Sequence, residues 1–179
     1  MTITVEPQQF SFVHFDAGLI ERITRSMVEA IGIDRPVHVQ IDESTPLGRV
    51  EIEIGPTIVI RAQSGALEDS KRPRQQSEVA TSATIGRALL RVRDRLEGGF
   101  GEAPADDDLS LRQVAAWDTY LAARLQRLGL PVNRQRSVYN FRNRHGFTDV
   151  ADAAFERIWQ ADGLTWGELE SISEAGVAS

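Results

Sequence analysis

Cysteine is absent from the 179 residues of the chain. Its absence excludes a disulfide framework and any metal site built from thiolates. Long apolar runs are also absent, since none approaches the roughly 20 residues that a membrane-spanning helix needs. The opening residues MTITVEPQQF lack the basic start and the apolar stretch of a secretory signal. We therefore expect a cytoplasmic protein with no membrane segment.

Lysine is scarce, since Lys71 is the single lysine beside nineteen arginines. Acidic residues outnumber basic ones, and the formal net charge is −6 at pH 7. This balance argues against general binding to nucleic acid or to anionic lipid. The hydrophobic share of 41% is ordinary for a globular protein, and the length suits one domain, or one domain with an extension.

Two helices are predicted in the first hundred residues. Asp16 precedes apolar residues at helical spacing, and Gly32 follows the last of them, which predicts a helix between them. Ser77 is expected to cap a second helix that runs to about Leu96. The stretch before it, residues 64–76, is expected to be a loop.

Three extended runs lie between these helices, at residues 37–41, 50–54 and 57–61. The first two alternate between apolar and polar residues, which is typical of half-buried strands. The third run is apolar on both faces and is therefore expected inside the sheet.

The rest of the chain reads as helical after an acidic loop at residues 101–108. One helix is expected over residues 111–128, and Thr148 is expected to cap another. Thr165 and Glu168 have the spacing of a capping box, which marks the start of a last helix. The predicted fold class is α+β: a helix, a three-stranded mostly antiparallel sheet and a helix, followed by a helical C-terminal extension. We expect a core over residues 1–108 and the extension over 109–179, or a single domain containing both.

The second predicted helix contains the stretch ATIGRALL, residues 83–90. It has the frame of a zinc-protease helix H-E-x-x-H, in which two histidines four residues apart bind zinc and the adjacent glutamate takes a proton from the bound water. None of those residue types is present: Ala83 has no donor atom, Thr84 is no general base near neutral pH, and Arg87 would repel the metal.

The surrounding segments nevertheless resemble the minimal zincin-like metallopeptidase family over about residues 15–97. The resemblance is carried, in this order, by residues 19–30, VHVQIDESTPLG (37–48), TIVIRAQSGALED (57–69) and SEVATSATIGRALLRV (77–92). It implies a zincin-like core in which Ala83 and Arg87 stand at the positions of the two histidine ligands and Thr84 at that of the glutamate. A degenerate metallopeptidase with no catalytic residues, no metal and no cofactor is therefore expected. The alternative is that Ala83 and Gly86 are small residues that allow close packing of the helix on the sheet.

Arginines and aromatic residues interleave in the segment NRQRSVYNFRNRHGFTD, residues 133–149. Guanidinium groups suit phosphate or carboxylate, and aromatic rings can stack on a ligand. The candidate residues for binding an anion or a partner are Arg134, Arg136, Arg142, Arg144 and His145. The alternative is structural: these arginines would form ion pairs with Asp94, Asp118, Asp149 or Asp152, and the aromatic residues Tyr139, Phe141 and Phe147 would be core.

We therefore predict a non-catalytic binding or scaffold protein that uses this segment for a protein partner or an anionic small ligand, with nucleic acid not favoured. One alternative is an enzyme acting on a phosphorylated or carboxylated small molecule, with the arginines holding the substrate and His145 as acid and base. Another is a homo-oligomer in which Trp117, Trp159 and Trp166 include interface residues.

Overall fold

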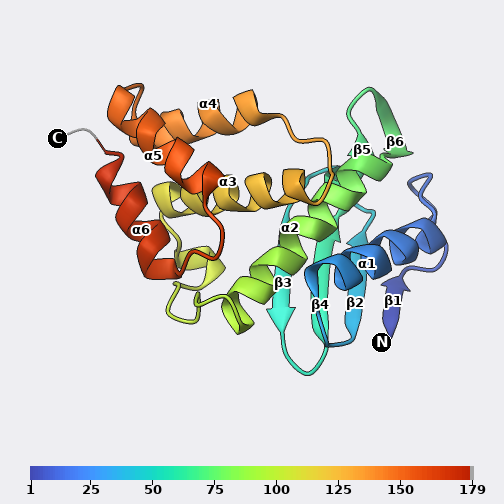
Figure 1. The fold of residues 1–179 in the computed structure, drawn as a ribbon. Helices are drawn as coiled ribbons and strands as arrows, with labels where there is room; N and C mark the ends of the chain where they lie inside the picture. Colours follow the sequence, from blue (N-terminus) through green and yellow to red (C-terminus); the bar gives the residue numbers. More distant parts are fainter. Residues whose placement is uncertain (178–179) are drawn as a thin grey trace. The chain divides into compact units, whose positions relative to one another are not determined.

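The computed structural model describes residues 1–177. The chain divides into two compact units, Met1–Val92 and a second unit that begins at Arg93. The division falls inside the helix α2 (Glu78–Leu96), whereas the sequence placed it after the acidic loop, between residues 108 and 109. Each unit is described here by itself (Figure 1).

The first unit contains a four-stranded sheet in the order β1-β2-β4-β3. Its strands are β1 (Ile3–Glu6), β2 (Val37–Asp42), β3 (Val50–Ile54) and β4 (Ile58–Gln63). β1 pairs parallel with β2, β2 pairs parallel with β4, and only β3 and β4 pair antiparallel. β4 lies inside the sheet, as its apolar sequence predicted.

The prediction of a three-stranded, mostly antiparallel sheet was therefore wrong in two respects. It omitted β1, a strand of four residues whose alternating burial leaves half its side chains exposed. It also missed that the helix α1 (Ala17–Ile31) returns the chain to the start of the sheet, so that the strands on either side of the helix run parallel. The α+β class itself is correct.

One face of this sheet is buried. Ile3, Val39 and Ile60 belong to it and are at most 6% exposed. Figure 1 shows α1 lying across the sheet, and the buried positions of α1 recur at helical spacing. The helix predicted after Asp16 is present, and the Asp16 side chain caps it by accepting a hydrogen bond from the Gly18 N–H.

The predicted loop at residues 64–76 is also structured. It contains a short 3₁₀ turn, Ser64–Ala66, and a hairpin of β5 (Glu68–Asp69) and β6 (Arg72–Gln76). The hairpin is tied to the N-terminal segment, because the His14 N–H donates to the Arg74 carbonyl at 2.8 Å. The predicted cap of α2 is confirmed, since the Ser77 hydroxyl accepts a hydrogen bond from the Ala80 N–H at 3.0 Å.

The second unit is helical. Its helices are α3 (Leu111–Arg127), α4 (Arg134–His145), α5 (Asp149–Gln160) and α6 (Trp166–Ala175), and a 3₁₀ turn covers Asp106–Asp108. The predicted caps are confirmed, with Thr148 capping α5 and the Thr165–Glu168 capping box beginning α6.

Aromatic rings fill the interior of this unit. The Phe100 ring lies 5.0 Å from Trp117 and 5.7 Å from Trp166, measured between ring centroids. Trp159 is also buried, so none of the three tryptophans offers an exposed ring for the oligomer interface that the sequence suggested. In the part of the chain that the structure describes, no helix is both long enough and apolar enough to cross a bilayer.

Candidate functional site: the exposed face of α4

The arginine-rich segment forms the helix α4. The Asn133 side chain caps it by accepting a hydrogen bond from the Arg136 N–H at 3.1 Å. Gly146 follows its last residue with φ 114°, a backbone conformation that suits glycine. Side chains three or four residues apart therefore share a face, and the aromatic residues do not form the alternating core that we had considered.

The inner face of α4 carries Phe141 and His145, which are 0% and 4% exposed. Their rings stack with centroids 3.8 Å apart and nearly parallel planes, and Phe155 of α5 meets the Phe141 ring edge-on. These two side chains therefore pack α4 against its neighbours within the unit.

Hydrogen bonds define the tautomer of His145. Its Nδ1 lies 3.1 Å from the Phe141 carbonyl oxygen, which can only accept, so Nδ1 carries the proton. Its Nε2 lies 2.7 Å from the Ser173 hydroxyl and accepts from it. Both ring nitrogens therefore have partners inside the unit.

The surroundings of His145 favour its neutral form. Burial lowers its pKa from the ordinary value, and the charge of Arg112 acts in the same direction. The hydrogen bond to the Phe141 carbonyl and the charge of Glu174 act against this but do not reverse it. A buried neutral imidazole with both nitrogens engaged does not present a proton or a positive charge to an external ligand.

Two of the four candidate arginines form ion pairs with α5. Arg142 donates two hydrogen bonds to the carboxylate of Asp152, each 2.8 Å long. This pairing raises the pKa of Arg142 and lowers that of Asp152, because each charge favours the other. Arg134 pairs with Glu156, and its guanidinium lies over the ring of Phe155. For these two arginines the structural alternative applies, with Asp152 as one of the predicted partners.

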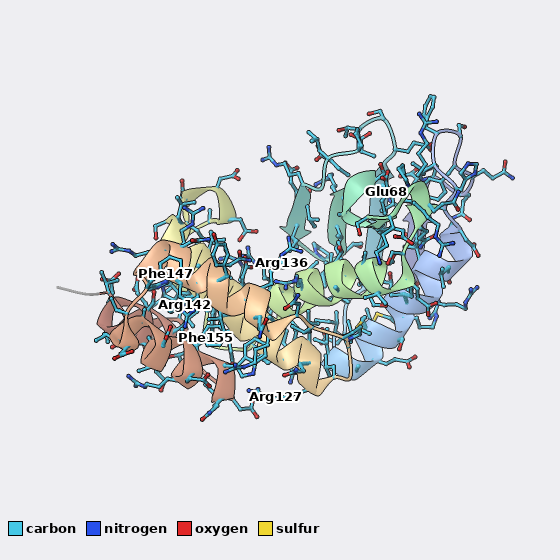
Figure 2. All side chains as sticks on the ribbon, turned by 90° about the horizontal axis from the view of Figure 1, so that it is seen from above. Glu68, Arg127, Arg136, Arg142, Phe147 and Phe155 are labelled. Carbon is cyan, nitrogen blue, oxygen red and sulfur yellow. The ribbon has the colours of Figure 1, made fainter. Side chains whose placement is uncertain are left out.

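The other two candidates face away from the unit. Arg136 and Arg144 are exposed, and neither guanidinium makes an ion pair with any described residue. Tyr139 and Phe147 are also exposed, at 58% and 64%, and their rings meet edge-on at 6.0 Å. Figure 2 shows Arg136 and Phe147 toward opposite ends of the helix.

We call this surface the exposed α4 face. It is formed by Arg136, Tyr139, Asn140, Asn143, Arg144 and Phe147, all exposed to solvent. The first five of these residues recur every three or four positions within α4, which places them on one side of the helix. Phe147 follows the end of the helix, and its ring meets that of Tyr139. The face combines two cations that pair with no described carboxylate, two amides and a pair of aromatic rings, and its six residues include no histidine, carboxylate or serine.

The helix α2 offers no chemistry at the positions of the zinc motif. The Thr84 hydroxyl donates a hydrogen bond of 2.8 Å to the Ala66 carbonyl, and Gly86 is buried. Within residues 1–177, no three His, Asp or Glu side chains gather closely enough to hold a metal ion. In the acidic turn, Asp106 pairs with Arg95 at 2.7 Å.

The signal for the exposed α4 face was present in the sequence as the helical spacing of Arg136, Tyr139 and Asn143. It was missed because the segment was treated as one cluster rather than as two faces of a helix. In comparisons with known proteins, no family model, no curated protein and no solved structure matches the chain.

Proposed function

We propose that the protein is a non-catalytic binding protein, and that its exposed α4 face binds an acidic segment of a partner protein. The observation that carries the proposal is that Arg136 and Arg144, which make no ion pair with any described residue, share a face of α4 with the exposed ring of Tyr139. The exposed ring of Phe147 meets that of Tyr139. Arginine and aromatic residues are enriched in the centres of protein interfaces and supply most of their binding energy.

Charge complementarity favours an acidic partner. A carboxylate can accept two parallel hydrogen bonds from a guanidinium, and no carboxylate within residues 1–177 pairs with Arg136 or Arg144. They are eight residues apart, which is about 12 Å along a helix. An acidic segment with apolar side chains between its carboxylates matches this spacing and the rings of Tyr139 and Phe147.

Nucleic acid is a weaker candidate for the same face. Its affinity depends on how many phosphates are neutralised, and two free arginines on a chain of net charge −6 neutralise few. Asp152 and Glu156 already compensate Arg142 and Arg134.

The alternative of an enzyme that uses His145 is not favoured. General acid–base catalysis needs a group within hydrogen-bond reach of the substrate, but His145 is 4% exposed and bonded to Ser173. The six residues of the exposed α4 face include no histidine or carboxylate that could take its place.

For the first unit, we propose a zincin-like scaffold without the chemistry of that family. The support is the order of a helix, strands and a second helix, together with the absence of ligand atoms at Ala83 and Arg87. Thr84, at the position of the glutamate, is bonded to a backbone carbonyl. This part of the proposal assigns no activity to the unit.

The binding proposal can be tested by peptide display against the purified protein. We expect enriched peptides to contain acidic residues separated by apolar ones. A synthetic peptide from that set should lose about tenfold or more in affinity for the double variant Arg136→Gln/Arg144→Gln, since each hydrogen bond to a charged group contributes about 1.5–3 kcal/mol.

The matched control is Arg22→Gln/Arg157→Gln, which removes the same charge from exposed positions elsewhere and should bind the peptide as the wild type does. Equal loss in both double variants would indicate a nonspecific charge effect and contradict the proposal. So would enrichment without acidic residues, stronger binding of a single-stranded oligonucleotide, or self-association by light scattering that the α4 double variant abolishes.

A further inference from the structure

A cavity of about 410 Å³ lies in the first unit. Its walls come from four segments: residues 12–13, 43–46, 64–68 and 73–74. The first three segments follow β1, β2 and β4, the three strands that run parallel. In open sheets of this kind, ligands bind in the crevice outside the carboxyl ends of the parallel strands.

The walls are held in place by hydrogen bonds and close packing. One carboxylate oxygen of Glu43 accepts from the backbone N–H groups of both Ser11 and Phe12. The Ser64 hydroxyl donates to the Thr45 carbonyl at 2.9 Å. Beside it, Gly65 lies so close to Pro46 that an added Cβ would come within 1.9 Å of the Pro46 carbonyl oxygen. The cavity is therefore preformed, as small-ligand sites usually are.

Two opposite charges line this cavity without pairing with each other. For the Glu68 carboxylate the described contact is the Ser64 hydroxyl, 3.4 Å away, and that hydroxyl has one proton, which it gives to Thr45. The Arg74 guanidinium makes no ion pair with any described residue. Figure 2 shows Glu68 at the start of the hairpin that also carries Arg74.

Arg74 is held in an unusual backbone conformation. Its φ is 64°, in the left-handed region that residues other than glycine seldom adopt. The His14 N–H bonds to its carbonyl, and His14 forms a bridge with Gln75. Such strain persists where the surrounding structure imposes it, and it concentrates at ligand sites.

An apolar surface completes the cavity. Phe12 is 67% exposed although its backbone is fixed by Glu43, and Pro46 and Pro73 are also in the lining. A ligand with an apolar side chain would cover this ring and gain the free energy of removing both surfaces from water.

We propose that the cavity binds a free α-amino acid with an apolar side chain. Its ammonium group would pair with Glu68, its carboxylate with Arg74, and its side chain would pack on Phe12. A ligand carrying only a cation would leave Arg74 unpaired and be repelled by it. A ligand carrying only an anion would leave Glu68 unpaired and be repelled by the carboxylates of Glu43 and Glu68. The volume is within the range of small-molecule sites.

The test is a titration of the isotope-labelled full chain with three probes, followed by nuclear magnetic resonance. L-phenylalanine carries both charges, phenethylamine lacks the carboxylate, and 3-phenylpropionate lacks the ammonium. We expect saturable shifts with L-phenylalanine at amides within residues 11–14, 43–48 and 64–76. Each of the other probes should bind about tenfold or more weakly, because one charge-assisted hydrogen bond is lost.

Two variants address the two charges. Glu68→Gln keeps the side-chain shape, and Arg74→Asn keeps a residue type that tolerates positive φ; each should weaken L-phenylalanine about tenfold. The control is Arg72→Gln, which removes the nearby ion pair with Asp69 outside the cavity and should leave binding unchanged. The amide spectrum of each variant verifies that it is folded.

The proposal is overturned if L-phenylalanine gives no saturation up to about 10 mM. It is also overturned if phenethylamine or 3-phenylpropionate binds as well, or if the shifts lie elsewhere in the chain. Because Arg136→Gln/Arg144→Gln changes only the second unit, that variant should bind L-phenylalanine normally, so the two proposals can fail separately.

Discussion

Asp94 and Arg124 are joined by two parallel hydrogen bonds of 2.7 Å inside the second unit. Their side chains are 3% and 14% exposed, and the indole N–H of Trp117 donates to the same carboxylate at 2.9 Å. The buried Asp94 carboxylate, which lies at the end of α2, therefore connects that end of the helix to α3 through these hydrogen bonds.

We predict that Asp94→Ala lowers the free energy of unfolding by about 3–5 kcal/mol, since it leaves the buried Arg124 charge without its partner. Urea unfolding followed by tryptophan fluorescence measures the change. For comparison, Glu21→Gln removes the exposed pair with Arg25 and should cost no more than about 0.5 kcal/mol. Similar losses in both variants would contradict a special role for the Asp94 cluster.

Arg142 and Arg144 are predicted to differ in their effect on the pKa of Asp152. Arg142 lowers the pKa of Asp152, so their pairing stabilises the fold above the ordinary pKa of an aspartate, and this stability is lost as the pH falls through the lowered value. Arg142→Gln should therefore raise the pKa of Asp152 toward its ordinary value in a carbon-detected titration. Arg144→Gln, which removes no described ion pair, should leave that pKa unchanged; an unchanged pKa in both variants would show that the Arg142 contact is not maintained in solution.

His145 should make the second unit less stable in mild acid. Burial lowers its pKa in the folded state, so the unfolded chain binds a proton more readily than the folded one. The free energy of unfolding should thus fall as the pH drops below the ordinary histidine value of about 6.5, until the lowered pKa is passed. The variant His145→Gln cannot take up this proton, and its unfolding curve between pH 7.5 and 5 should depend less on pH. Parallel curves for the two proteins would disprove this assignment.

Gly65 is predicted to tolerate no side chain. An added Cβ would lie 1.9 Å from the Pro46 carbonyl and 2.5 Å from that of Leu47, so Gly65→Ala must displace backbone and should cost about 1–3 kcal/mol. The control is Gly167→Ala in α6, where a Cβ meets nothing within 4 Å; this change should stabilise by about 0.5–1 kcal/mol. Thermal unfolding of both variants measures the difference, and a Gly65→Ala protein as stable as the wild type would mean that the loop at residues 43–48 yields easily.

The features that the sequence predicted well are those set by neighbouring residues. Caps at Ser77, Thr148 and Thr165 depend on hydrogen bonds within three residues, and all three are present. The sheet was predicted less well, because the pairing of β1 with β2 joins residues 34 positions apart. A strand of four residues shows too little alternation to be recognised without that partner.

The candidate site was only partly predictable for the same reason. The sequence identified the arginines of α4, but whether each one forms an ion pair depends on α5. That helix places Asp152 beside Arg142, whereas Arg144 pairs with no described carboxylate. The cavity near Glu68 and Arg74 was not anticipated at all. Its residues come from four separate segments and carry no motif, so only the folded chain brings them together.

The parallel pairing of β1 has a consequence for the synthesis of the chain. Residues 3–6 are synthesised before the strand that pairs with them, Val37–Asp42, which is translated only after the whole of α1. The growing polypeptide must therefore hold β1 without its partner strand until the residues 34 positions further along have been made. At 5–20 residues per second this lasts several seconds, during which a chaperone or a neighbouring nascent chain has access to Ile3 and Val5.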